Sequence, residues 1–149
     1  MLQPAAFDLV SAALRHARDA EWLASKANPN RSPDQAYHLA GYGPECARKA
    51  TVRAPWLYRT IGHRFDQASE TVLDVAVALD PLALRYEPRS WAIRFTALAA
   101  WREDVRYDRT GSKRAEQVEA LLADCREAVD RVVVGLWADG LVPDGEAPW

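Results

Sequence analysis

The sequence predicts an all-α protein, folded as a single bundle of four to five helices. Apolar residues recur at steps of three and four along several segments, and no segment shows the apolar–polar alternation of a strand. Asn-Pro, Asp-Pro and Glu-Pro pairs separate these segments. A chain of 149 residues is the length of one domain that can bury most of its apolar surface.

The first helix is expected from Pro4 to Ala27. Phe7, Val10 and Leu14 are spaced along one helical face, with charged residues between them. Asn28-Pro29-Asn30 then ends the helix, because proline cannot continue it.

The second helix is expected from Ala36 to Ala50. Ser32, Pro33 and Gln35 precede it as a capping box with proline in the first turn. Small residues form a stripe that lets a neighbouring helix approach closely: Ala36, Leu39, Ala40, Gly43, Ala47 and Ala50. The other side carries aromatic and charged residues: Tyr37, Tyr42, Glu45, Arg48 and Lys49.

Pro44 conflicts with a continuous second helix. An interior proline removes a backbone hydrogen bond and costs about 3 kcal/mol or more. The helix is therefore expected either to kink after Gly41 or to restart with Pro44 in its first turn.

Three further helices are expected: Asp66–Leu79, Ser90–Trp101 and Ser112–Ala138, the last one being the longest and capped by Ser112. The segments between them are expected to be a connection at Val52–Arg64 and a loop at Val105–Gly111. Residues 1–138 would form the domain. Residues 139–149, which are rich in glycine, proline and acidic residues, are expected to be a flexible tail.

The string AYHLAGYGPECARKA at residues 36–50 resembles the A-x-Y-L-A-G-Y-A-x-E-C-x-x-K-A signature of HEPN domains. These are small helical domains of prokaryotic toxin–antitoxin and defence loci. The matching residues include Gly41, Tyr42, Glu45, Cys46, Lys49 and Ala50. Two later strings are similar to other elements of the family: GHRFD at residues 62–66 to a His-Asp-Leu element, and WREDVRY at residues 101–107 to W-x(4)-R-Y. The resemblance implies a HEPN-like bundle directed at RNA or nucleotides.

The ribonuclease branch of the family carries R-x(4–6)-H, in which arginine holds phosphate and histidine assists attack by the ribose 2′-hydroxyl. Here Arg102 occupies the arginine place, and Arg106 stands where histidine is expected. Arginine stays protonated and cannot act as a base at neutral pH. The motif is therefore degenerate. The resemblance leaves open whether the chain is an enzyme; if active, it would be a metal-independent endoribonuclease.

Other histidines offer a replacement for the missing one. His63 ends an R-x(3)-H string, and with Asp66 nearby it is either an oriented catalytic residue or part of a helix cap. Arg31 and His38 form an R-x(6)-H string, but a lone histidine on a helix is more often a packing or exposed residue. His16 is expected on the solvated face of the first helix. The candidate catalytic residues are therefore His63 and Arg102.

The candidate residues for binding RNA or a nucleotide are Glu45, Lys49, Arg106, Tyr107 and Arg109. Glu45 and Lys49 form either an intrahelical ion pair or, as the resemblance implies, the wall of a groove in which Lys49 faces phosphate. Arg102, Arg106 and Arg109 make the loop around Tyr107 the best local cationic patch. Tyr107 and Trp101 can stack on a base or pack as helix-end aromatics.

Composition restricts the partners and the compartment. A net charge of −2 gives no global attraction for nucleic acid, so a polyanion site must be a local patch. Two separate cysteines and the absence of a CxxC or HExxH pattern predict no metal and no cofactor. With no leader and no apolar run of membrane-spanning length, the chain is expected in the cytoplasm, away from membranes.

Three functions remain open. The first is a HEPN-type protein acting on RNA or a nucleotide in a toxin–antitoxin or phage-defence system, as a homodimer whose Arg102–Tyr107 segments meet across a two-fold groove. The second is a non-catalytic interaction module, an antitoxin or assembly subunit that binds a cognate protein from the same operon, such as a nucleotidyltransferase. The third is a helical scaffold with a tryptophan-rich interface.

Overall fold

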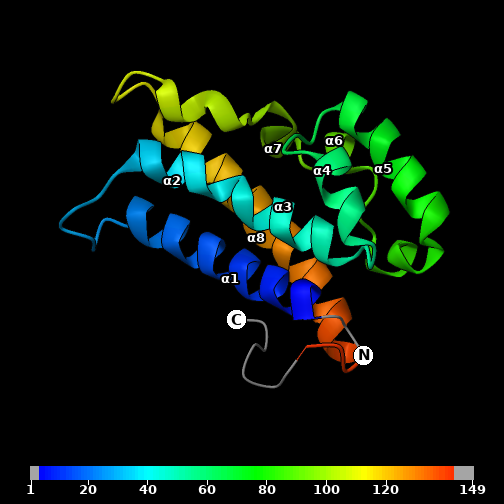
Figure 1. Ribbon diagram of the computed structural model, residues 1–149. Helices are drawn as coiled ribbons and strands as arrows, with labels where there is room; N and C mark the ends of the chain where they lie inside the picture. The colour runs from blue at the N-terminus through cyan, green and yellow to red at the C-terminus, as the bar shows by residue number, and fades with distance from the viewer. Residues whose placement is uncertain (1–3, 143–149) are drawn as a thin grey trace.

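The computed structural model of the protein describes residues 4–142, and all regular structure in that range is helical (Figure 1). Five α-helices have eight residues or more: α1 (Pro4–Ala24), α2 (Pro33–Ala40), α3 (Tyr42–Ala50), α5 (Gln67–Leu79) and α8 (Ala115–Ala138). The remaining segments are short: η1 (Pro55–Leu57), α4 (Tyr58–Ile61), η2 (Pro81–Tyr86), α6 (Trp91–Arg94), α7 (Thr96–Ala100) and η3 (Glu103–Tyr107). The all-α class is confirmed, but the described residues contain more helices than the four to five expected.

One reason for the higher count is that the helix expected at Ser90–Trp101 is interrupted. Phe95 leaves the helical region at φ −120° and ψ 79°, and its ring is buried in the core. The Asp124 side chain on α8 then accepts hydrogen bonds from the backbone N–H groups of Ala97 (2.9 Å) and Leu98 (3.1 Å). This carboxylate thus pairs with backbone N–H groups in the first turn of α7 that have no partner within the helix. A single continuous helix is therefore wrong for this segment.

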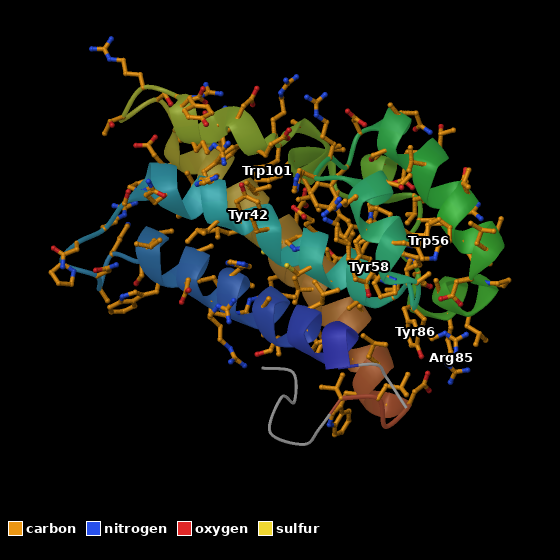
Figure 2. All side chains as sticks on the ribbon, in the orientation of Figure 1. Tyr42, Trp56, Tyr58, Arg85, Tyr86 and Trp101 are labelled. Atoms are coloured by element: carbon orange, nitrogen blue, oxygen red, sulfur yellow. The ribbon has the colours of Figure 1, made fainter. Side chains whose placement is uncertain are left out.

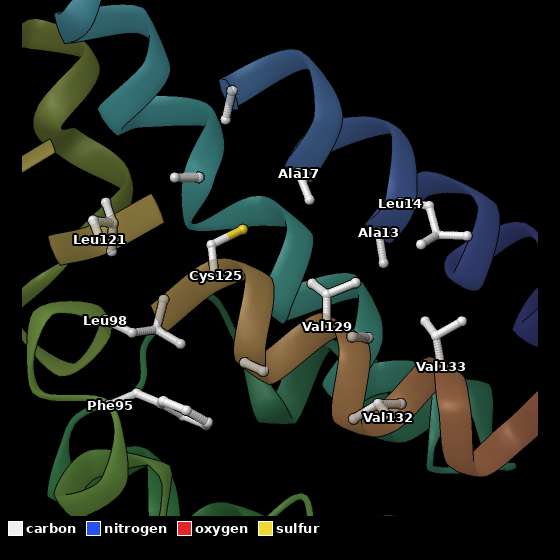
Figure 3. Close-up of a cluster of buried hydrophobic side chains, with 14 of the residues drawn as sticks. Ala13, Leu14, Ala17, Phe95, Leu98, Leu121, Cys125, Val129, Val132 and Val133 are labelled. Atoms are coloured by element: carbon white, nitrogen blue, oxygen red, sulfur yellow. The ribbon is translucent and has the colours of Figure 1, made fainter. Parts of the chain in front are cut away.

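The main core lies where α1, the α2–α3 pair and α8 run alongside one another (Figure 1). Figure 3 shows small and β-branched side chains from α1 and α8, among them Ala13, Ala17, Cys125 and Val129, filling this interface. The predicted stripe of small residues on α2 and α3 packs here, and its alanines and Gly43 are buried. A methyl group added at Gly43 would lie only 3.2 Å from the Ala13 carbonyl oxygen and 3.3 Å from the Cys125 sulfur. The stripe therefore does let the helices approach closely.

The expected break at Gly41 is also present. Helix α2 ends at Ala40 and α3 begins at Tyr42, which places Pro44 in the first turn of α3, where a backbone N–H is not needed. Gly41 keeps right-handed helical angles (φ −77°, ψ −27°), so the two helices follow one another closely in direction (Figure 1).

The indole of Trp101 explains why residue 41 is glycine. A Cβ atom at position 41 would lie 2.1 Å from the indole ring, which is a severe overlap. The indole is 1% exposed, and its N–H donates a hydrogen bond to the Tyr37 carbonyl oxygen (3.1 Å). Trp101 is thus a core residue and cannot stack on a base in this conformation.

Two predicted helix caps are wrong. Ser32 precedes α2, but its side chain makes no capping hydrogen bond, and α8 begins at Ala115 instead of Ser112. Asp34 provides the reason for the second difference. Its carboxylate accepts hydrogen bonds from the backbone N–H groups of Gly111 (2.8 Å) and Lys113 (3.2 Å), which holds that segment as a loop against α2.

The segments η1, α4, α5 and η2 form a lobe beside the bundle (green in Figure 1), with a second, smaller core. That core consists of Val52, Leu57, Ile61, Leu73, Ala76, Val77 and Ala83. The expected connection at Val52–Arg64 therefore contains part of this lobe. Asp66 caps α5 by accepting a hydrogen bond from the Ser69 backbone N–H (2.9 Å).

Ordered contacts continue past Ala138. Asp139 accepts a hydrogen bond from the Tyr86 hydroxyl (2.9 Å), and Val142 is buried. The rest of the expected tail, residues 143–149, lies outside the described residues. Among the helices of residues 4–142, none has the length and apolar character needed to span a bilayer.

Candidate functional site

The most unusual polar region of the molecule surrounds one face of α3. Tyr42, Glu45 and Lys49 stand at positions i, i+3 and i+7, so they project from the same side of the helix. Glu45 and Lys49 are only 8% and 9% exposed. Buried charged side chains must be paired, and these two are.

Glu45 stands at the centre of the first group. One of its carboxylate oxygens, Oε1, accepts a hydrogen bond from Lys49 Nζ (2.6 Å), and the other, Oε2, lies 2.9 Å from His63 Nδ1. The His63 side chain is 53% exposed, so a ligand can reach the imidazole while the carboxylate is shielded. A carboxylate on one ring nitrogen fixes the tautomer and orientation of an imidazole and leaves the other nitrogen for proton transfer.

Tyr42 forms the second group, with two more histidines. Its hydroxyl lies 3.2 Å from His38 Nε2, and its ring packs against the His38 ring from α2 (centroids 5.2 Å apart) and the His16 ring from α1 (5.9 Å). Figure 2 shows Tyr42 next to Trp101, with which it makes an edge-to-face contact. All three histidines of the chain therefore adjoin Tyr42 or Glu45 on this face of α3.

Burial changes the titration of the second group. It lowers the pKa of His38, and the charge of the nearby Arg106 lowers it further. It also lowers the pKa of His16, assisted by Arg15 and opposed by Asp19 and Glu45. Both imidazoles therefore favour the neutral form.

The pKa of Tyr42 moves in the other direction. Burial raises it, while Arg106 opposes the rise through its charge and a side-chain hydrogen bond. The Tyr42 hydroxyl thus remains a protonated hydrogen-bond donor at neutral pH.

The buried side chain of Arg48 on α3 holds the loop that carries His63 in place. Arg48 is 1% exposed, with its guanidinium 5.0 Å from the centre of the Phe65 ring and 4.5 Å from that of Trp91. It also pairs with Glu70 at 3.0 Å. Because Phe65 is two residues after His63, this contact holds the loop against α3. Burial lowers the pKa of Arg48 to about 10, and Glu70 opposes the change.

The loop at residues 62–66 also meets η3, which contains Arg106 of the predicted arginine patch, while Arg102 directly precedes η3 and Arg109 follows it. Arg64 lies 3.8 Å from Glu103, and this contact brings the GHRFD and WREDVRY segments together. Arg102 is exposed and pairs with Asp104 at 3.1 Å. Arg106 lies over the ring of Tyr107, which is 77% exposed, with 4.8 Å between the guanidinium carbon and the ring centre.

The structure thus places the predicted residues in different surroundings. Glu45, Lys49 and His63 are in direct contact, and Lys49 pairs with Glu45, as the intrahelical alternative requires. Arg106 is exposed, and its positive charge lowers the pKa of His38 and opposes the rise in the pKa of Tyr42. Arg102, Tyr107 and Arg109 are exposed too: Arg102 precedes η3, Tyr107 ends it and Arg109 lies in the following loop.

Sequence reasoning did not identify the grouping of His16 and His38 around Tyr42. Part of the signal was present, since His38 and Tyr42 are four residues apart on consecutive helical turns. The approach of His16 depends on how α1 packs against α3, which no local spacing reveals.

Among the described residues, no group of three or more histidine, cysteine or acidic side chains is arranged to hold a metal ion. No family model matches the chain, and neither the curated proteins nor the solved structures include a significant match to it. The function must therefore be argued from the site itself.

Proposed function

We propose that this protein is a HEPN-like protein of a prokaryotic toxin–antitoxin or phage-defence system, and that it cleaves RNA through His63 without a metal ion. The observation that carries the proposal is the half-exposed His63 imidazole, bonded through Nδ1 to the buried Glu45 carboxylate at 2.9 Å. This arrangement is typical of a general acid–base pair.

The chemistry follows from the free ring nitrogen. In its neutral form His63 can take the proton of a ribose 2′-hydroxyl through Nε2, while Glu45 stabilises the imidazolium that forms. The 2′-oxygen then bonds to phosphorus and the bond to the 5′-oxygen breaks, with a proton passing to that leaving oxygen. The expected products carry a 2′,3′-cyclic phosphate and a 5′-hydroxyl.

The HEPN-like assignment is supported by how three separate strings of the sequence meet. The signature string forms α2 and α3, Trp101 of the WREDVRY string covers its glycine, and the GHRFD string supplies His63. The degenerate R-x(4–6)-H motif would then be compensated by a histidine from another loop.

The test uses a fluorescent single-stranded RNA and a DNA of the same sequence, in EDTA. Wild-type protein should cleave the RNA only, and the His63→Ala and His63→Gln variants should lose about 10²- to 10⁴-fold in rate. Arg131→Ala, which alters an exposed arginine on α8, is the matched control and should cleave normally. Cleavage by His63→Ala at the wild-type rate would overturn the proposal.

A second candidate function, the non-catalytic interaction module, is favoured by a different surface. Val75 and Leu79 stand four residues apart on α5, Leu82 follows in η2, and all three are more than half exposed. We call these residues the outer apolar surface. Contiguous exposed apolar side chains are typical of a protein interface. If wild-type protein cleaves no RNA and Leu79→Lys abolishes binding of a protein from the same operon, this second function is the correct one.

A further inference from the structure

A groove between α1 and α8 lies apart from the His63 site. Its volume is about 420 Å³, which is within the range of small-molecule sites in proteins. The two helices run in opposite directions, so the end of α1 lies beside the first half of α8 (Figure 1). None of the residues that contact His63 lines the groove. Aliphatic side chains from both helices form much of its lining: Ala24, Val118, Leu122 and Ala123.

An ion pair between the two helices closes one end of the groove. Arg126 on α8 donates hydrogen bonds from Nε and Nη2 to the two carboxylate oxygens of Glu21 on α1, both at 2.7 Å. A contact with two parallel hydrogen bonds fixes the relative geometry of the two side chains. The groove is therefore formed before any ligand binds, and the charge of Glu21 is already neutralised.

The other end of the groove carries more positive than negative charge. Within the part of the chain that the structure describes, Lys26 has no acidic partner. Arg31 donates from Nε to the Ala24 carbonyl oxygen (2.9 Å), which anchors the guanidinium at the end of α1 and leaves its two terminal nitrogens for a ligand. The acidic residues that line the groove are the paired Glu21 and the exposed Glu119. Two cations therefore stand against one acidic side chain at this end.

We propose that the groove binds an amphipathic carboxylate, a small molecule whose aliphatic chain or ring ends in one carboxylate. The aliphatic lining fits the apolar part, because the free energy gained is proportional to the apolar area removed from water. The carboxylate fits beside Lys26 and Arg31, since a guanidinium can donate to both carboxylate oxygens at once. The site shares no residue with the proposed cleavage chemistry, so this inference goes beyond the proposed function.

The test compares three probes that have the same aliphatic chain: octanoate, octan-1-ol and octylamine. In isothermal titration calorimetry, octanoate should bind saturably and about tenfold more tightly than octan-1-ol, the order expected for one charge-assisted contact. Octylamine should bind most weakly, because its charge is repelled by Lys26 and Arg31. The methyl NMR signals of Val118 and Leu122 should shift on addition of octanoate, which locates the ligand in the groove.

Variants separate the apolar part of the site from its charges. Ala123→Phe should prevent binding of both octanoate and octan-1-ol, because the ring fills the groove from an exposed position without entering the core. The Lys26→Gln/Arg31→Gln variant should lose about tenfold in octanoate affinity. It should keep its affinity for octan-1-ol, which shows that the groove is still folded. Glu119→Gln should bind octanoate more tightly than the wild type, because a like charge is removed. Arg131→Gln, which alters an exposed arginine elsewhere on α8, is the matched control and should bind octanoate normally.

The outcome for this groove can be distinguished from the outcome for RNA cleavage. His63→Ala should bind octanoate as the wild type does, whether or not the wild-type protein cleaves RNA. Equal affinity for octanoate and octylamine overturns the inference, and so does full octanoate affinity in Ala123→Phe or in the Lys26→Gln/Arg31→Gln variant. Octanoate binding without any RNA cleavage overturns only the proposed function.

Discussion

At the scale of single residues, the partly buried histidines connect the candidate site to stability. The pKa values of His16 and His38 are lowered in the folded protein, so the unfolded chain binds more protons near and below the ordinary histidine value of 6.5. Folding stability from these residues is fully present above pH 6.5 and is lost as the pH falls through the folded pKa values. We expect the His16→Asn/His38→Asn double variant to lose less stability than the wild type between pH 7.5 and pH 5, as measured by urea unfolding. Equal losses would contradict the burial of these imidazoles.

Gly41 gives a second prediction at this scale. An alanine methyl group would lie 2.1 Å from the Trp101 indole, so the buried ring must move or α2 must shift. We expect Gly41→Ala to destabilise the fold by about 3 kcal/mol or more, at the upper end of overpacking effects. Gly43→Ala, whose nearest contact is 3.2 Å, is the graded control and should cost less in the same denaturant experiment.

These residues also show what can be predicted from the sequence alone. The resemblance of residues 36–50 to the HEPN signature singled out Gly41, Glu45 and Lys49, and the Glu45–Lys49 contact follows from their i, i+4 spacing. The contact from Glu45 to His63 joins residues 18 apart and depends on how a loop folds back. Helical periodicity carries no information about such a contact. The burial of Arg48 could not be predicted from the sequence either, because an arginine on a polar helix face is ordinarily exposed.

At the scale of elements, the contact between α3 and α5 is expected to contribute most to the free energy of unfolding. Glu70 on α5 accepts hydrogen bonds from Arg48 (3.0 Å) and from the backbone N–H groups of Ser90 (3.0 Å), Trp91 (2.9 Å) and Ala92 (3.2 Å). We expect Glu70→Ala to cost about 3–5 kcal/mol, because it leaves the Arg48 charge buried without its partner. The measurement is the free energy of unfolding in urea.

The matched control for the Arg48–Glu70 pair is a second ion pair, within the lobe. Arg53 pairs with Asp80 at 3.2 Å, but its own side chain is 55% exposed. Because water screens an exposed charge, Arg53→Ala should cost less than about 1 kcal/mol. Similar costs for Glu70→Ala and Arg53→Ala would show that the Arg48–Glu70 pair has no special role.

The elements themselves were predicted unevenly, for physical reasons. Long amphipathic helices such as α1, α5 and α8 have strong periodicity, and their ranges agree with the expected ones within a few residues. The break at Phe95 was missed because the segment lacks a proline or glycine there. That break depends on Asp124 of α8, which lies 27 residues from Ala97 and binds its backbone.

At the scale of the whole molecule, the outer apolar surface bears on assembly. We propose that the protein forms a homodimer and expect light scattering at micromolar concentration to give twice the chain mass of 16.6 kDa. Leu79→Lys should shift the protein toward the monomer, because it places a charge in the apolar surface. Tyr107→Ser tests the other expected interface, the Arg102–Tyr107 groove. A wild-type protein that stays monomeric at every concentration contradicts the dimer.

The position of α8 in the chain has a consequence for synthesis. The core between α1 and α3 is closed by α8, which emerges from the ribosome last among the described helices. At about 5–20 residues per second, the interval between the synthesis of Ala50 and Ala138 is roughly 4–18 s. During that time the stripe on α2 and α3 lacks its final cover. The stripe is made largely of alanine and glycine, so the partly synthesised chain exposes little apolar area before α8 packs against it. This favours productive folding over aggregation in the cell.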